Sequence, residues 1–193
     1  SNAGLLTVNQ NTTITGQPVN VISCEGSTVN YSVTATGLAL TYAWEVSTDG
    51  GTLWNPATGG IYSGSGTSTL TLTGITTAHH NNQYRVQVGG GCGLDVTSTA
   101  RTLTVNETPE IAVGGHPSAS TICENTATSF SVNAGATTLP TYQWQVSTNG
   151  GLSYVNVADD ADHDNVTSAT LDLVSTPLSF NTRLYRVIIS GTC

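Results

Sequence analysis

The residues best suited to chemistry form an acidic run in the second half of the chain. Four aspartates fall within six positions: Asp159, Asp160, Asp162 and Asp164. A Ca²⁺ ion needs several oxygen ligands, so these carboxylates form a candidate calcium site. The run lacks the glycine and the terminal glutamate of an EF-hand loop. The alternative is a solvated loop that binds nothing.

The histidines and hydroxyl side chains show no spacing typical of a catalytic or zinc site. His79 and His80 are adjacent, whereas His116 and His163 stand alone. A zinc site needs three or four converging ligands, so we expect these histidines to be exposed polar residues. Ser and Thr occur throughout, and nothing marks one of them as a nucleophile. The sequence therefore predicts no enzyme activity and no cofactor apart from the candidate calcium.

Trp54 and Tyr154 are the aromatic residues best placed to bind a ligand. On a flat sheet face such rings could stack on a sugar, which would make them carbohydrate-binding residues. The alternative, which we favour, is that they cover an edge of the core. A solvent-facing row of aromatic rings would support carbohydrate binding, and buried rings would support a structural role.

Trp54 ends a segment, Ser47–Trp54, that resembles the Asp-box hairpin of sialidase propellers. Leu53 departs from that motif, and a propeller needs many more residues than this chain has. We interpret the segment as a tight turn in which Asp49 binds its own backbone and Gly50 or Gly51 has a positive φ.

The chain contains an internal repeat with a spacing of about 100 residues. Five segments of the first half return in the same order in the second half. They are Tyr42–Gly51 as Tyr142–Gly151, Cys24-Glu25 as Cys123-Glu124, Tyr84–Val86 as Tyr185–Val187, Cys92 as Cys193, and Leu6–Asn9 as Leu103–Asn106. The repeat predicts two homologous units.

Apolar and polar residues alternate along several short segments of each unit, which is typical of half-buried antiparallel strands. The expected strands are 28–35, 41–47, 68–73, 83–89 and 96–105, followed by 127–133, 141–147, 169–174 and 184–190. Residues 74–83 and 174–182 each have room for one short helical turn. Nothing predicts a longer helix.

About seven short strands in ~100 residues, with a tryptophan on the third, indicate an immunoglobulin-like sandwich. We therefore predict an all-β chain of two tandem immunoglobulin-like β-sandwich domains. Trp44 and Trp144 are expected in the cores, against Val86 and Val187. Tyr84 and Tyr185 stand where such a fold has its tyrosine corner.

The motifs Cys-Glu-Gly, Tyr-x-Trp-x-Val-Ser-Thr-Asp-Gly-Gly, Ile-Tyr-Ser-Gly and Tyr-Arg-Val-x-Val-x-Gly-x-Cys resemble tandem bacterial immunoglobulin-like repeats. The resemblance covers nearly all of residues 4–193, although Asn125 replaces Gly26 and Tyr154 replaces Trp54 in the second unit. It implies a long secreted or cell-surface protein, in which such repeats act as spacers or binding modules.

The repeat also predicts the domain boundaries: 10–106 for domain 1 and 107–193 for domain 2, which lacks its last strand. Residues 1–9 combine a tag scar, Ser1-Asn2-Ala3, with the last strand of a preceding repeat. We expect residues 4–9 of one molecule to pair with residues 184–190 of another, as in donor-strand complementation. The alternative is that 4–9 extends the first strand of domain 1.

The cysteines present two pairings. The simple one joins Cys24 to Cys92 and Cys123 to Cys193. However, Cys24 precedes one strand and Cys92 follows a strand running the same way, so they lie at opposite ends of a ~27 Å sandwich. We therefore prefer Cys24 with Cys193 across the junction between the domains.

The charge excludes some partners. The chain has four basic residues, Lys and Arg together, and twelve acidic residues, so its net charge is −8. Four basic residues cannot form the basic patch that binding to nucleic acid requires. No apolar stretch is long enough to insert into a membrane. We predict a non-enzymatic extracellular or cell-surface repeat, structural or adhesive, whose partners are neighbouring repeats or a surface glycan or protein. The alternative is a carbohydrate-binding accessory module of a secreted glycoside hydrolase.

Overall fold

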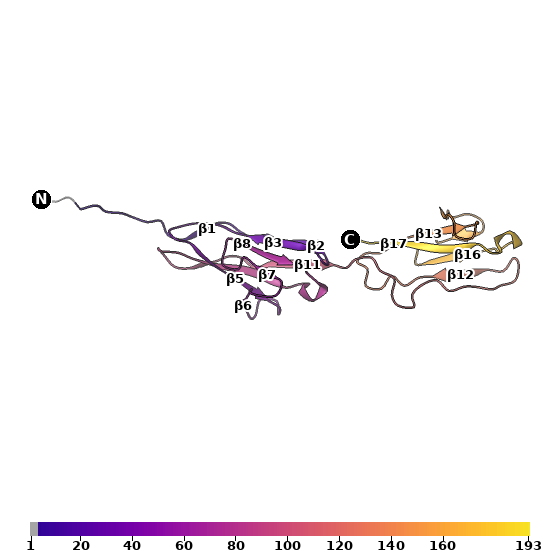
Figure 1. Ribbon diagram of the computed structural model, residues 1–193, viewed down its shortest axis with the longest axis horizontal. Helices are drawn as coiled ribbons and strands as arrows, with labels where there is room; N and C mark the ends of the chain where they lie inside the picture. Colours follow the sequence, from indigo (N-terminus) through magenta and orange to yellow (C-terminus); the bar gives the residue numbers. More distant parts are fainter. Residues whose placement is uncertain (1–3) are drawn as a thin grey trace. The chain divides into compact units, whose positions relative to one another are not determined.

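The computed structural model describes residues 4–193, and the predicted tag scar at residues 1–3 lies outside them (Figure 1). The chain divides into two compact units, the first ending at Asn106 and the second spanning Glu107–Cys193. Both are built from strands, with one turn of 3-10 helix each, η1 (Thr77–His79) and η2 (Leu178–Phe180). The all-β prediction and the two short turns are confirmed.

Unit 1 contains two main sheets and a small strand pair. The larger sheet runs in the order β2 (Val21–Cys24), β11 (Arg101–Asn106), β9 (Gln83–Gly89), β5 (Thr41–Ser47) and β6 (Asn55–Pro56), and β10 (Val96–Thr97) also pairs with β9. The second sheet holds β3 (Thr28–Ser32), β8 (Thr69–Thr73) and β7 (Tyr62–Ser63). β1 (Thr13–Gly16) pairs with β4 (Thr34–Thr36). β11 and β2 are parallel, and the other pairs are antiparallel.

The core of unit 1 is formed where the inward faces of these sheets meet. Trp44 lies opposite Val86 and is 1% exposed, as predicted, and its indole Nε1 donates to the carbonyl of Thr67 at 2.9 Å. The rings of Tyr31 and Tyr84 stack with centroids 4.8 Å apart. Alternation along the strands therefore sends every second side chain into one shared core.

Unit 2 repeats the plan with fewer strands. One sheet holds β12 (Thr128–Ser131), β16 (Thr170–Leu173) and β15 (His163–Asp164), and the other holds β14 (Val155–Asn156), β13 (Thr141–Ser147) and β17 (Leu184–Ser190). Trp144 is fully buried opposite Val187, and its Nε1 donates to the Ser168 carbonyl at 2.9 Å.

The two units differ at one sheet edge. In unit 1, β9 pairs with β5 on one side and with β10 and β11 on the other. Within residues 4–193, β17 pairs with β13 alone. Inward residues of β9, such as Tyr84 and Val86, are fully buried, whereas their counterparts Tyr185 and Val187 are half-buried.

Two predicted strands are broken. Strand 28–35 divides at Val33, whose amide donates to the Ser68 carbonyl, and the remainder joins β1. Strand 96–105 divides at Ser98, whose hydroxyl accepts the amide of Val86 at 3.0 Å in place of a ladder bond. Alternation alone does not reveal such breaks, because the apolar pattern continues across them.

The tyrosine-corner prediction is wrong. Within the described residues, the hydroxyl of Tyr84 is buried without a hydrogen-bond partner. The hydroxyl of Tyr185 bonds to a side chain, Nε2 of His163 at 3.1 Å, instead of to the backbone. Sequence position identifies where each ring lies, but the partner of its hydroxyl depends on neighbours from other strands.

Candidate functional site

The segment between β5 and β6 is a tight turn, as predicted. The Asp49 carboxylate accepts the amides of Thr52 and Leu53 at 3.0 and 2.9 Å, and Gly50 and Gly51 both have positive φ. The Leu53 amide, and then the Ser47 hydroxyl, lower the pKa of Asp49 by stabilising its charged form. In unit 2 the neutral Asn149 accepts the Ser153 amide at 3.0 Å and builds the same turn.

Each turn presents an aromatic ring to the outer face of the sheet. The Trp54 indole donates to the Gly51 carbonyl at 3.0 Å, and the Arg85 guanidinium lies 4.0 Å from the centre of the ring. Arg85 Nε donates to Glu45 at 2.6 Å. Because residues 45 and 85 are cross-strand partners on β5 and β9, the sheet holds this ion pair beside the ring.

Unit 2 repeats the arrangement with a different ring and without the ion pair. The Arg186 guanidinium lies 3.9 Å from the centre of the Tyr154 ring and donates through Nε to Gln145 at 2.8 Å. We call these two sets the aromatic–arginine clusters: Glu45, Trp54 and Arg85 in unit 1, and Gln145, Tyr154 and Arg186 in unit 2. Each arginine covers a face of its ring, where a sugar would otherwise stack.

The carboxylates of the acidic run bond mainly to nearby backbone. Asp159 accepts the Val166 amide at 3.2 Å, and Asp164 accepts the Asn165 amide at 2.8 Å. Asp160 accepts the amides of Asp162 and His163 at 2.8 Å, and the Asp162 amide is the main cause of its lowered pKa. In residues 4–193, no three Asp, Glu, His or Cys side chains are grouped so as to hold a metal ion. The four aspartates are therefore not brought together.

His163 is buried, so the expectation that it is an exposed polar residue is wrong. It is 5% exposed and stacks on Phe180 with centroids 5.2 Å apart. Its Nδ1 lies 3.0 Å from Asp160, and its Nε2 lies 3.1 Å from the Tyr185 hydroxyl. Its place on a short strand within the acidic run gives no sequence signal, because β15 has only two residues, too few to show alternation.

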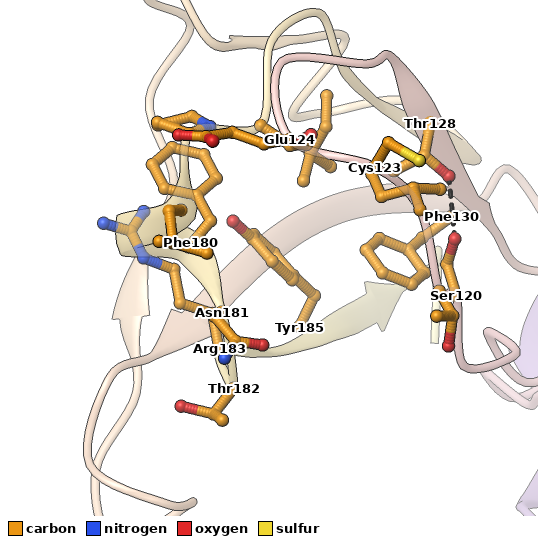
Figure 2. A pocket seen from close by; sticks show the side chains of 16 residues that line it. Ser120, Cys123, Glu124, Thr128, Phe130, Phe180, Asn181, Thr182, Arg183 and Tyr185 are labelled. Carbon is orange, nitrogen blue, oxygen red and sulfur yellow. Dashed lines mark hydrogen bonds between the residues drawn. The ribbon is translucent and has the colours of Figure 1, made fainter.

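A groove opens on unit 2, with a cavity volume of about 250 Å³. We call it the unit 2 groove. Its walls are the segments 120–124 and 176–183, and Figure 2 shows the rings of Phe130 and Tyr185 between them. These rings stack with centroids 5.3 Å apart, as Tyr31 and Tyr84 do in unit 1. The sequence analysis did not predict this cavity.

Two cysteines, Cys92 and Cys123, are free thiols, the first half-buried and the second exposed. The preferred pairing of Cys24 with Cys193 stays a prediction. The described residues include no helix that is long and apolar enough to cross a membrane.

Known structures share this fold over most of the chain. The chain superposes on DIP-gamma IG1+IG2 with a TM-score of 0.63 and 12% identity, covering 95% of this chain and 91% of that one. It matches the titin I-band fragment I67-I69 with a TM-score of 0.62, 16% identity and coverage of 95% and 65%. It matches Drosophila OTK extracellular domains 3-5 with a TM-score of 0.58, 16% identity and coverage of 100% and 61%.

The prediction of two tandem immunoglobulin-like domains is thereby confirmed at the level of fold. No protein-family model and no curated protein matches the chain.

Proposed function

We propose that this chain is a non-enzymatic structural module, an extracellular repeat of a larger secreted or cell-surface protein that positions or joins neighbouring repeats. The observation that carries the proposal is the use of its reactive side chains within the fold. The acidic run bonds mainly to nearby backbone, the arginines cover the aromatic rings, and His163 is buried between Phe180 and Tyr185.

Similar structures lend support to the proposal. Tandem immunoglobulin domains of the matched proteins include segments described as extracellular, such as OTK domains 3-5. A bacterial adhesin-like origin rests on the motif resemblance in the sequence. An antibody against unit 1 tests the location: we expect it to label intact cells that make the protein. Labelling that appears only after permeabilisation would contradict the proposal.

The aromatic–arginine clusters make carbohydrate binding the less favoured alternative. Each unit presents one ring, Trp54 or Tyr154, and an arginine occupies one of its faces. We expect titration calorimetry with soluble polysaccharides and a glycan array to give no saturable binding. Binding that is lost in Trp54→Ala or Tyr154→Ala, and kept in the neighbouring Leu53→Ala, would support the accessory-module alternative instead.

A further inference from the structure

We propose that the outer face of β17 in unit 2 binds a partner protein that presents a carboxylate beside aliphatic side chains. The surface consists of Tyr154 and three residues of β17, Leu184, Arg186 and Ile188, and we call it the β17 face. The inference rests on the proposed structural role, in which the chain joins other protein modules, and it names the chemistry of one partner. It follows from comparing this face with the same place in unit 1.

In unit 1, a carboxylate of the same sheet pairs with the arginine. Arg85 lies over the Trp54 ring and donates through Nε to Glu45 at 2.6 Å. Gln87 donates to the other oxygen of the same carboxylate at 3.1 Å. The charge of Arg85 is therefore balanced by a neighbour on the adjacent strand.

Unit 2 keeps the arginine and lacks the carboxylate. Gln145 stands at the position of Glu45, because each is the cross-strand partner of its arginine. The Gln145 amide oxygen accepts from Arg186 Nε at 2.8 Å but carries no charge. Within residues 4–193, Arg186 takes part in no ion pair. A guanidinium is a planar fork of N–H donors, and a carboxylate is the group that matches this fork with two parallel hydrogen bonds.

The Tyr154 ring and Gln145 hold this cation in one orientation. The guanidinium carbon of Arg186 lies 3.9 Å from the centre of the ring, and the bond to Gln145 fixes Nε. A side chain that is already oriented loses less entropy when it binds. Both neighbours are uncharged, so the charge of Arg186 remains available to a carboxylate from outside the chain.

The residues on either side of Arg186 differ between the units in one direction. Leu184 and Ile188 face the same way as Arg186, since each is two residues from it along the strand. They are 44% and 45% exposed. The pairing of β17 with β13 and of β9 with β5 places Gln83 and Gln87 at these positions in unit 1. Two polar residues of unit 1 are therefore aliphatic in unit 2, beside the arginine that has no carboxylate.

This combination of side chains favours a protein partner over an acidic sugar. Tyr and Arg are enriched among the residues that dominate binding at protein interfaces, and apolar side chains around them lose water on contact. Arg186 covers one face of the Tyr154 ring, and Leu184 and Ile188 offer no hydrogen bonds to sugar hydroxyls. In unit 1 the group bound to the arginine is itself a protein carboxylate, Glu45.

Pairing at the edge of β17 would leave the β17 face in place. Outward side chains project roughly perpendicular to a sheet, so a strand added alongside does not cover them. Arg186 reaches across β13 toward Tyr154. The predicted contact of residues 4–9 with 184–190 of another molecule would use the edge and stays a prediction. Residues 4–12 form no strand, so the alternative that 4–9 extends the first strand of domain 1 is wrong.

NMR spectra of the isotope-labelled chain test the carboxylate. The probe is the capped tripeptide acetyl-Leu-Glu-Leu-amide, and its Leu-Gln-Leu analogue is the control. The Glu peptide should shift the Arg186 Nε–H signal and the amide signals of 184–188 in a saturable way, and the Gln peptide should bind about fivefold more weakly. Equal binding of the two peptides, or an Arg186 signal that does not move, would overturn the proposal.

Two reciprocal substitutions exchange the partner residue between the units. Gln145→Glu gives unit 2 the carboxylate that unit 1 has, and should abolish the response of Arg186 without lowering the thermal midpoint of unit 2. Glu45→Gln should make the Arg85 Nε–H signal, silent in the unchanged chain, respond to the Glu peptide. An unchanged response of Arg186 in Gln145→Glu, or of Arg85 in Glu45→Gln, would overturn the role of the carboxylate.

The double variant Leu184→Gln, Ile188→Gln copies the residues of unit 1 and tests for a protein partner. These exposed positions should tolerate the change without unfolding, and the affinity for the Glu peptide should fall about fivefold or more. Sodium glucuronate, a carboxylate on a sugar, should bind both chains equally and more weakly than the peptide does. An unchanged affinity for the peptide, or glucuronate that binds the unchanged chain as tightly as the peptide, would overturn the protein partner.

Surface labelling does not involve the β17 face, so that either failure would leave the proposed structural role standing. Conversely, labelling only after permeabilisation would contradict the structural role without affecting the peptide titration.

Discussion

Replacing Trp44 by alanine removes the largest fully buried side chain of unit 1. The indole lies opposite Val86 and beside the Tyr31 ring, with centroids 6.5 Å apart. Its Nε1–H bond to the Thr67 carbonyl ties β5 to the turn before β8. The substitution therefore tests the core and one polar tie at the same time.

The expected loss in the free energy of unfolding of unit 1 is about 3–5 kcal/mol from the cavity. The lost hydrogen bond adds about 1 kcal/mol. Trp144→Ala should fall at the lower end of the range. Its surroundings on β17, such as Val187, are only half-buried, so that unit 2 can relax into the space more easily than unit 1.

Urea unfolding followed by circular dichroism and fluorescence measures both losses. Trp54 still reports on unit 1 in Trp44→Ala, and Trp144 reports on unit 2 as an internal reference. Trp44→Phe is the matched control, since it keeps a ring in the core and should lose less.

A loss below about 1 kcal/mol in Trp44→Ala would refute the reasoning, because a surface substitution costs that little. Equal shifts of both units would also refute it, since each unit has its own core.

Three further predictions concern single side chains. The pKa of Asp49 is lowered in the folded state, so its charged form stabilises unit 1 above the unfolded-state pKa of about 3.9, and this stabilisation is lost as the pH falls through the folded-state pKa. The urea midpoint of unit 1 should therefore drop less in acid for Asp49→Asn than for the unchanged chain. The same pH dependence of the urea midpoint in both chains would contradict this. Arg85→Ala should destabilise unit 1 by about 0.5–1 kcal/mol, since the ion pair and ring contact are partly exposed, and added salt should shrink the difference from the unchanged chain. Alkylation without reductant should modify Cys92 and Cys123, and peptide mapping should join Cys24 to Cys193; a Cys24–Cys92 peptide would disprove the cross-junction pairing.

Strands with continuous alternation were predictable to the residue. Segments 41–47, 83–89, 141–147 and 184–190 match β5, β9, β13 and β17. In each of them apolar and polar side chains alternate over seven residues, and the strand pairs with one or two adjacent strands along that length. The Asp49 turn was predictable because Asx side chains and glycines act locally.

Features set by contacts between distant segments were not predictable. Arg85 and Trp54 meet only because β5 and β9 pair in one register, and His163 is buried by Phe180 and Tyr185 from later in the chain. The walls of the unit 2 groove come from segments 120–124 and 176–183, which are far apart in the sequence. Residue type alone assigned His163 to the surface, where most polar residues lie.

The edge of β17 that has no partner strand within residues 4–193 has a consequence for local opening of unit 2. An amide exchanges its hydrogen with solvent when its strand opens locally, and the free energy of that opening follows the burial and pairing around it. β9 is enclosed by partners on both sides, whereas β17 has β13 on one side within the described residues. Hydrogen exchange should therefore reach the β17 amides well before those of β9, and proteases should first attack the chain around 120–124 and 176–183. A β-strand added along that edge would slow both processes, so that pairing at the edge and resistance to proteolysis would rise together.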